Sequence, residues 1–266
     1  MKFLVDDITY HVEICGEGHP LLLLHGFTGR GTNWMPYCST IGNKAKLIMP
    51  DIIGHGLTEH PEVLGRYEIE SVAKDCISIL DQLGIEQVDL LGYSMGGRLA
   101  ISLAILFPNR IRKLILESAS PGLATEEARR ERQQADEKLA HFIKEKGIIE
   151  FVDYWEDIPL FQSQKSLPEI TRDRIRTQRL ANHPIGLINS LLGMGTGSQP
   201  SYWENLKEMK AESLFIVGEL DQKFCQIALQ MQKSLPKAKI YKVKNAGHAI
   251  HVEQAEKFGT IVSGFL

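Results

Sequence analysis

The residue best placed to do chemistry is Ser94, in the segment Gly92-Tyr93-Ser94-Met95-Gly96. An apolar run (88–91) precedes this segment and a helix-like stretch (98–107) follows it, which is the strand, turn and helix that a G-x-S-x-G nucleophile pattern requires. Such a turn strains the serine backbone, so the two flanking glycines must lack a Cβ. The hydroxyl then lies at a helix N-terminus, where backbone N–H groups favour an anion. The pattern predicts a catalytic serine; the alternative is a glycine-rich turn with an incidental serine.

A serine hydroxyl needs a neighbouring base, and two later segments offer a histidine and an acid. His248 follows the strand predicted over 240–243, and Asp221 follows the strand predicted over 214–217. We expect His248 to take the serine proton and Asp221 to orient the imidazole. Two alternatives remain for the acid: Glu219 lies two residues away, and Asp221 could instead cap the helix expected from Cys225.

Other histidines and two backbone amides complete the predicted site. The N–H groups of Met95 and of Phe27, which follows His25-Gly26, would stabilise an oxyanion, although His25-Gly26 could be a simple turn. His25 and His55 lie beside glycines and are expected to make structural hydrogen bonds. His251 forms an H-x-x-H pair with His248, but no metal-type cluster accompanies it, so no metal site is predicted.

The elements that must position these residues alternate between strand and helix. Residues 2–15 indicate an antiparallel hairpin that turns at Asp6-Asp7, and 69–83 carry a helical stripe. Short apolar runs predict the other strands: 21–24, 46–49, 88–91, 113–116, 214–217 and 240–243. The prediction is an α/β fold with an eight-stranded, mostly parallel sheet flanked by helices.

The alternation breaks off after the sixth strand. From about residue 121 to 203 the sequence is helical or irregular, and it includes the charged stretch 126–146. We therefore expect a core of residues 1–120 and 204–266, interrupted by a helical lid of residues 121–203. The insertion follows a strand at the carboxyl edge of the sheet, where ligands bind in such folds.

Composition excludes several classes of function. The net charge of −3 gives no reason to expect nucleic acid or an anionic membrane as a partner, and no apolar run is long enough to span a bilayer. The N-terminus becomes acidic too early for a signal peptide. The glycines of 193–198 lack the βαβ context of a nucleotide site, so no cofactor is expected. Four scattered cysteines (Cys15, Cys38, Cys76 and Cys225) are expected to be reduced thiols in a cytoplasmic protein.

Together these segments resemble the α/β-hydrolase superfamily across nearly the whole chain. The segments that carry the resemblance are 25–27, 51–56, 92–97, 218–221 and 247–248. The order Ser94, Asp221, His248 is also that of α/β-hydrolase sites. Further segments are similar to the MenH family of menaquinone biosynthesis: Gly92 to Arg98, 120–123, 131–133, 153–155 and Phe224.

The narrower resemblance implies a lyase rather than a hydrolase. That family eliminates pyruvate from 2-succinyl-5-enolpyruvyl-6-hydroxy-3-cyclohexene-1-carboxylate to give 2-succinyl-6-hydroxy-2,4-cyclohexadiene-1-carboxylate. The resemblance assigns the proton abstraction to Ser94, backed by His248 and Asp221. It implies substrate binding by Tyr93, Arg98, Arg132, Trp155 and Arg179. Arginine suits a substrate with three carboxylates because its fork binds a carboxylate bidentately.

Two other functions stay open at this point. One is hydrolysis of a small ester or of a C–C bond next to a ketone, with Ser94 as nucleophile. The other is a ligand receptor with little or no turnover. The expected partner is in each case a small molecule, and the oligomeric state is expected to be a monomer or a weak dimer.

Overall fold

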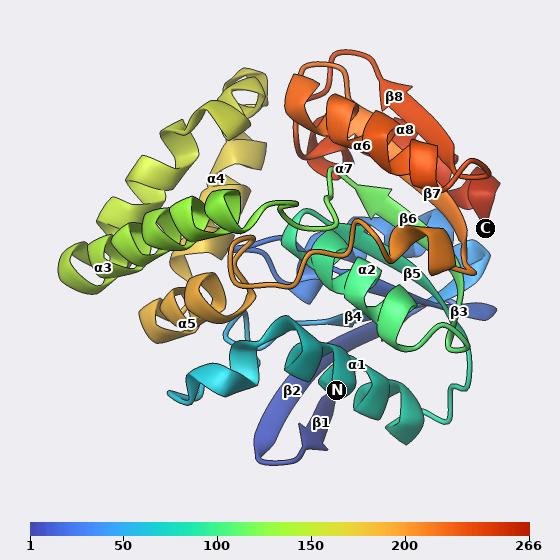
Figure 1. Cartoon of the computed structure of the whole chain (residues 1–266), viewed down its shortest axis with the longest axis horizontal. Coiled ribbons are helices and arrows are strands. Elements are labelled where there is room, and N and C mark those ends of the chain that lie inside the picture. Colours follow the sequence, from blue (N-terminus) through green and yellow to red (C-terminus); the bar gives the residue numbers. More distant parts are fainter.

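The computed structural model describes all residues 1–266, and an eight-stranded sheet runs through its centre (Figure 1). The strand order is β1-β2-β4-β3-β5-β6-β7-β8. The strands are β1 (Lys2–Val5), β2 (Ile8–Cys15), β3 (His19–Leu24), β4 (Ala45–Pro50), β5 (Val88–Tyr93), β6 (Ile111–Glu117), β7 (Glu212–Gly218) and β8 (Lys239–Val243). β2 pairs antiparallel with both β1 and β4, and all other strand pairs are parallel, which confirms the predicted mostly parallel sheet.

Helices cover both faces of this sheet. The α-helices are α1 (Ile69–Gln82), α2 (Met95–Leu106), α3 (Glu126–Asp157), α4 (Glu169–Leu180), α5 (Pro184–Met194), α6 (Gln222–Ser234), α7 (Ile250–Glu253) and α8 (Ala255–Phe265). The short 3-10 helices are η1 (Gly31–Ser39), η2 (Ile41–Asn43), η3 (Leu64–Tyr67), η4 (Pro159–Ser166) and η5 (Leu206–Glu208). One apolar core joins α1, α2 and α6 to the sheet, and a second joins η1, η2, α7 and α8 to its other face. Burying both faces explains why the central strands read as continuous apolar runs.

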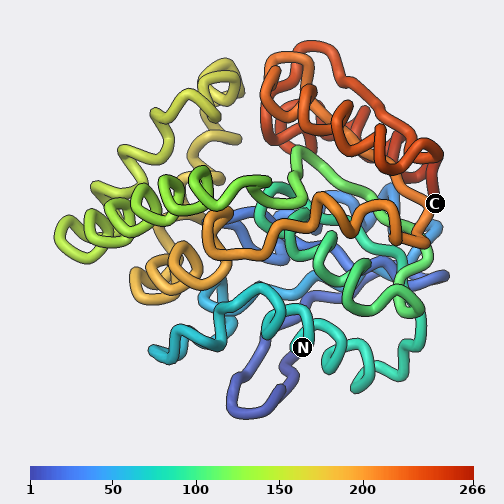
Figure 2. The backbone as a smooth tube through the Cα atoms, in the orientation of Figure 1, coloured from blue at the N-terminus to red at the C-terminus, as the bar shows by residue number.

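The inserted helices form a separate group after β6. Figures 1 and 2 show α3, α4 and α5 together on one side of the sheet. These helices have a small core of their own, which includes Phe151 and Leu187. Gly147 interrupts the long α3, because its positive φ is non-helical (φ 82°, ψ 179°). The insertion therefore lies over the carboxyl ends of the strands without joining the sheet.

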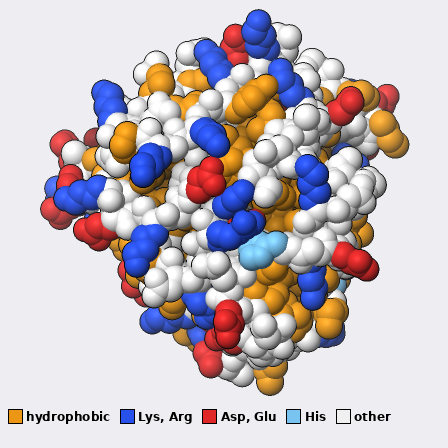
Figure 3. Space-filling model, turned by 90° about the vertical axis from the view of Figure 1, so that its right-hand side faces the viewer, with side chains coloured by type: hydrophobic (Ala, Val, Ile, Leu, Met, Phe, Trp, Pro, Cys, Tyr) orange, Lys and Arg blue, Asp and Glu red, His pale blue; other side chains and the backbone are white.

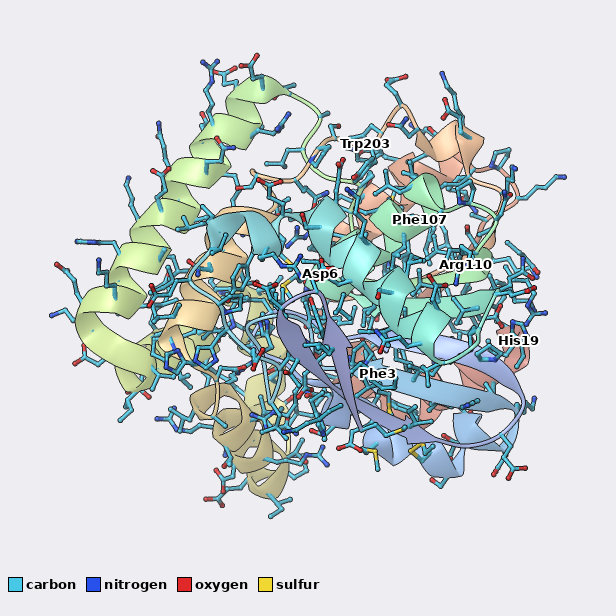
Figure 4. All side chains as sticks on the ribbon, turned by 90° about the horizontal axis from the view of Figure 1, so that it is seen from below. Phe3, Asp6, His19, Phe107, Arg110 and Trp203 are labelled. Atoms are coloured by element: carbon cyan, nitrogen blue, oxygen red, sulfur yellow. A yellow bond between two sulfur atoms is a disulfide. The ribbon has the colours of Figure 1, made fainter.

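The N-terminal hairpin turns where its charge pattern predicts. Asp6 has a positive φ of 52° and lies at the tip of the β1–β2 hairpin (Figure 4). Aspartate tolerates this left-handed conformation better than most residues. The end of β2 then lies beside η1, and this proximity decides the state of two cysteines.

The expectation of four reduced thiols is wrong for two of them. Cys15 at the end of β2 and Cys38 in η1 form a disulfide, whereas Cys76 and Cys225 are free and buried. The partners are 23 residues apart in sequence, so no local spacing marks them as a pair. Only the packing of η1 against the antiparallel end of the sheet brings them together.

Candidate active site

Ser94 occupies the strained turn between β5 and α2. Its φ of 51° and ψ of −107° lie in a region that non-glycine residues rarely adopt. A Cβ on Gly92 would collide with the backbone of Gly96, and a Cβ on Gly96 would collide with the backbone of Leu24. The turn is held further by a hydrogen bond of 2.9 Å from the Ser94 N–H to the Glu117 carbonyl. The residues around Ser94 thus fix its backbone by contact, as the spacing of the glycines predicts.

The structure brings Ser94, His248 and Asp221 into one hydrogen-bonded chain. His248 Nε2 lies 2.9 Å from Ser94 Oγ, and His248 Nδ1 lies 2.6 Å from Asp221 Oδ2. His248 is 1% exposed and Asp221 is 9% exposed. The imidazole ring is enclosed by the rings of Phe224 and Tyr93, with centroids 4.7 and 5.4 Å away. This is the arrangement in which a histidine can take the proton of a serine while a carboxylate fixes its tautomer.

The second oxygen of Asp221 answers the question left open by the sequence. Asp221 Oδ1 accepts a hydrogen bond of 3.3 Å from the Phe224 N–H, so the residue caps α6 as well as contacting His248. Glu219 instead faces the amide of Asn245 at 3.4 Å and makes no contact with the imidazole. The two interpretations of Asp221 are therefore compatible, because its two oxygens have different partners.

Two backbone amides near Ser94 have no acceptor in the protein. Met95 is the first residue of α2, a position whose N–H has no acceptor within the helix. The Phe27 N–H donates to no protein acceptor, and Phe27 and Met95 line the same cavity as Ser94. Both donors are consequently free to bind a ligand oxygen.

His25 and His55 make structural hydrogen bonds in the loops beneath Phe27. His25 Nε2 accepts a hydrogen bond of 2.9 Å from the Ile52 N–H, and His55 Nδ1 lies 3.1 Å from the Ile53 carbonyl. Burial lowers the pKa of His25 to about 4 and that of His55 to about 3. Both imidazoles are neutral at pH 7 and neither contacts Ser94.

A cavity of about 520 Å³ opens in front of Ser94, between the sheet edge and the inserted helices. Of the residues predicted to bind substrate, Tyr93, Arg98, Arg132 and Trp155 line it. Trp155 packs against Phe27 and Phe151, with ring centroids 5.4 and 5.6 Å away. The aromatic rings of Phe27 and Trp155, and the two arginines, thus line the cavity together with Ser94.

Arg98 is the deeper of the two cations. Its Nη1 donates to the Met194 carbonyl at 2.6 Å and to Gln199 Oε1, which ties α2 to the end of the insertion. Burial, together with the neighbouring Arg132 guanidinium, lowers the pKa of Arg98 to about 9, while Asp136 opposes this shift. The side chain still carries its charge at neutral pH, and its Nε and Nη2 donate to no protein group.

Arg132 lies at the lid side of the cavity and is paired. Its Nε donates to Asp136 Oδ1 at 2.9 Å, and its side chain is 40% exposed. The neighbouring Arg129 instead contacts the Gly197 carbonyl at 3.3 Å and does not line the cavity. The structure therefore distinguishes Arg132 from its neighbours, as the family pattern does.

Arg179 does not line the cavity that contains Ser94. It is 7% exposed and contacts Gln164 Oε1 at 3.3 Å and Glu156 Oε1 at 3.4 Å. Its guanidinium lies over the Phe161 ring, 4.8 Å from the centroid, and lines smaller pockets on the other side of that ring. Phe161 thus separates Arg179 from the Ser94 cavity.

The buried pair of Glu117 and His251 near the site was not predicted from the sequence. Glu117 Oε1 accepts hydrogen bonds from the backbone N–H and Nδ1 of His251, at 2.8 and 2.9 Å. Glu117 is fully buried, and the Tyr93 ring packs on His251 with centroids 4.6 Å apart. The signal in the sequence was an acidic residue, Glu117, directly after the apolar run 114–116.

Comparisons with known proteins agree with this geometry. The family model described as "alpha/beta hydrolase fold" matches residues 19–255. The chain is 49% identical over 246 residues to a Bacillus subtilis (strain 168) protein named "Putative 2-succinyl-6-hydroxy-2,4-cyclohexadiene-1-carboxylate synthase", covering 92% of this chain and 89% of the relative. The solved structure of MenH from S. aureus matches with a TM-score of 0.92 and 36% identity, over 96% of this chain and 97% of that one. The chain belongs to the MenH family of the α/β-hydrolase fold.

A further MenH relative is more distant. The 2-succinyl-6-hydroxy-2,4-cyclohexadiene-1-carboxylate synthase of Yersinia pestis bv. Antiqua (strain Nepal516) is 28% identical, over 92% of this chain and 86% of that protein. Membership in the MenH family confirms the resemblance drawn from the segments around Ser94, Asp221 and His248.

Two properties of the surface and helices complete the description. None of the helices combines the length and apolar character that crossing a bilayer requires. On the face drawn in Figure 3, basic and acidic side chains are interspersed, without a continuous basic stripe.

Proposed function

We propose that this protein is a lyase that eliminates pyruvate from 2-succinyl-5-enolpyruvyl-6-hydroxy-3-cyclohexene-1-carboxylate. The product is 2-succinyl-6-hydroxy-2,4-cyclohexadiene-1-carboxylate, the compound that MenH relatives are named for making. The observation that carries the proposal is the chain from Asp221 through His248 to Ser94, opening on a cavity with two arginines.

The reaction begins with a proton transfer at the serine. His248 Nε2, 2.9 Å from Ser94 Oγ, accepts the hydroxyl proton while the Ser94 oxygen takes the ring proton of the substrate. Asp221, 2.6 Å from Nδ1, stabilises the imidazolium that forms. The electron pair left on the ring moves through the conjugated system and breaks the C–O bond to the enolpyruvyl group. This group leaves as the enolate of pyruvate, which takes up one proton, the equivalent of the proton held on His248, to become pyruvate.

Backbone N–H groups stabilise the negative charge that develops on the substrate. The electron pair passes through the ketone of the succinyl arm, whose oxygen becomes negative. The unpartnered N–H groups of Phe27 and Met95 stabilise that oxygen, and removing one such donor typically costs about 100-fold or more in rate.

Two arginines hold the substrate carboxylates in this proposal. Arg98 retains two nitrogens, and Arg132 its two terminal nitrogens, without a protein acceptor. A hydrogen bond between charged groups contributes about 1.5–3 kcal/mol, so a carboxylate gains much from either arginine. The aromatic wall of Trp155 and Phe27 fits the ring of the substrate. Arg179, behind Phe161, is assigned to positioning that ring rather than to a carboxylate.

The alternative of ester hydrolysis uses the same serine as a nucleophile. An esterase with an apolar acyl pocket has no need for a buried guanidinium one helical turn from its nucleophile. Solved esterases share this fold at 24% identity or less, a likeness that speaks for the fold and not the reaction.

The experiment is an assay of pyruvate release with the purified protein and freshly generated enolpyruvyl substrate. We expect release far above the spontaneous rate, and a loss of about 1,000-fold or more in Ser94→Ala. Arg98→Ala should keep its fold and raise KM by about 10- to 100-fold, through the lost charge-assisted hydrogen bond. If pyruvate release were no faster than in the blank and the protein hydrolysed small esters, the lyase proposal would be wrong and the hydrolase alternative would be supported.

We also propose a cytoplasmic location, supported by membership in a family of biosynthetic enzymes. Cell fractionation tests this directly, and recovery of the protein outside the cytoplasm would contradict it.

A further inference from the structure

Asp136 is a buried charge that the proposed reaction does not use. It is 3% exposed, and only its Oδ1 is paired, with Arg132 Nε at 2.9 Å. Its Oδ2 is buried and has no hydrogen-bond partner. A buried, half-satisfied carboxylate costs free energy, so it needs an explanation.

The surroundings place Asp136 directly behind the cavity wall. Arg132 and Gly195 line the cavity, and a Cβ on Gly195 would lie 2.6 Å from Asp136 Oδ2. On its other side Asp136 lines an outer groove of the lid, together with Arg132 and Lys138. Arg132 therefore lies between the substrate cavity and the outer groove, and Asp136 holds it there.

Three charged side chains determine the electrostatics of this end of the cavity. Arg98 and Arg132 supply two positive charges, and Asp136 supplies one negative charge. Burial raises the pKa of Asp136 above its usual value, and the charge and hydrogen bond of Arg132, with the charge of Arg98, offset this only in part. The ionised Asp136 carboxylate offsets one of the two positive charges of Arg98 and Arg132.

We propose that Asp136 is a specificity-determining residue: an internal counter-ion that competes with the carboxylate of the substrate for Arg132. The inference rests on the part of the proposed function that has Arg98 and Arg132 binding carboxylates. A ligand carboxylate that binds the free terminal nitrogens of Arg132 is repelled by the negative charge of Asp136, which contacts the same guanidinium. Binding is weakened, and carboxylated products leave more readily for the same reason.

Removing the charge should therefore tighten binding without speeding the reaction. Asp136→Asn keeps the shape and leaves both arginines uncompensated, which should bind a dianion about tenfold more tightly at low ionic strength. KM should fall, and kcat should not rise, because binding that is equal in the ground and transition states does not lower the barrier between them.

Calorimetric titration with succinate tests this without turnover, and neutral succinamide is the ligand control. The matched variant is Glu131→Gln, since Glu131 lines the same cavity but has no arginine partner. We expect about tenfold tighter succinate binding for Asp136→Asn, and less than about twofold change for Glu131→Gln. The gain should vanish when Arg132→Gln is added to Asp136→Asn, because the two effects are coupled.

Asp136→Ala removes the charge in a second way and carries the same expectation. The proposal is overturned by unchanged or weaker succinate binding in the Asp136 variants, by an equal gain in Glu131→Gln, or by no succinate binding in any form. It is overturned too if both Asp136 variants unfold, because the ion pair is then purely structural. A protein that binds succinate as expected but releases no pyruvate would contradict the lyase alone.

Discussion

At the scale of single residues, Asp221 performs two tasks with two oxygens. One oxygen contacts His248 Nδ1 at 2.6 Å and the other accepts from the first turn of α6. Replacing Asp221 with Ala should therefore damage two properties at once. We expect a loss of about 1,000-fold or more in kcat and a loss of about 0.5–2 kcal/mol in unfolding free energy from the missing cap.

The matched control for this prediction is Glu219→Ala. Glu219 is an acid two residues away that touches only the amide of Asn245. Turnover and urea denaturation of both variants separate the two effects. If Glu219→Ala lost as much activity as Asp221→Ala, the assignment of the acid would be wrong.

His55 makes the stability of the fold depend on pH. In the unfolded chain an imidazole titrates near 6.5, whereas burial lowers the pKa of His55 to about 3 in the fold. Between these values the unfolded state binds the extra proton, so stability falls as pH decreases. His55→Gln should lose about 2 kcal/mol less unfolding free energy than the wild type between pH 6.5 and pH 5.

Urea denaturation at several pH values measures this difference. His141→Gln is the control, because His141 is exposed on α3 and pairs only with Glu145. Identical pH dependence in His55→Gln and wild type would contradict the lowered pKa, because it would show that His55 binds a proton equally well in the folded and unfolded states.

The residues that sequence reasoning found, and those it missed, differ in a physical way. Ser94, Asp221 and His248 each follow the carboxyl end of a parallel strand, so their relative positions come from the sheet itself. Arg179 was expected to bind substrate, but it packs over Phe161 and does not line the Ser94 cavity; no spacing predicts which side of a ring a lid residue occupies. Asp136 is four residues after Arg132, yet only the structure shows that its second oxygen is buried without a partner.

At the scale of elements, the turn between β5 and α2 is fixed by backbone contacts rather than by side chains. A methyl group on Gly96 would collide with the carbonyls of Leu24 and His25 at the end of β3. Gly96→Ala should therefore cost at least about 3 kcal/mol of unfolding free energy, the range of severe overpacking, and should displace Ser94.

Gly65→Ala is the control for this prediction, because nothing lies within 4 Å of the added methyl group. It should change stability by less than about 0.5 kcal/mol. Chemical denaturation measures the unfolding free energy of both variants, and pyruvate release measures their activity. A stable, active Gly96→Ala protein would contradict the account of the turn.

The elements themselves were predictable to different degrees. The hairpin at Asp6-Asp7 and the parallel strands follow from alternation and from apolar runs, because the pleat and two-sided burial leave such patterns. The break of α3 at Gly147 was not predicted, since one glycine in a charged stretch gives no sign of a change in helix direction. Helices packed mainly on one another leave weaker patterns than strands buried on both faces.

At the scale of the whole molecule, the site depends on segments far apart in the chain. Ser94 and His248 are 154 residues apart, and the arginines of α2 and α3 line the same cavity. The Cys15–Cys38 disulfide arises in the same way, from topology and not from local spacing. The order of the elements was readable from the sequence; side-chain contacts between distant elements required the structure.

The central claim is that Ser94 takes a proton from the substrate ring and does not attack a carbonyl. Substrate carrying deuterium at that ring carbon tests it directly, with pyruvate release followed in a single turnover at excess enzyme. We expect slower release from the deuterated substrate, because the C–H bond breaks before pyruvate leaves. Equal rates for the two substrates, or a covalent intermediate on Ser94, would contradict it.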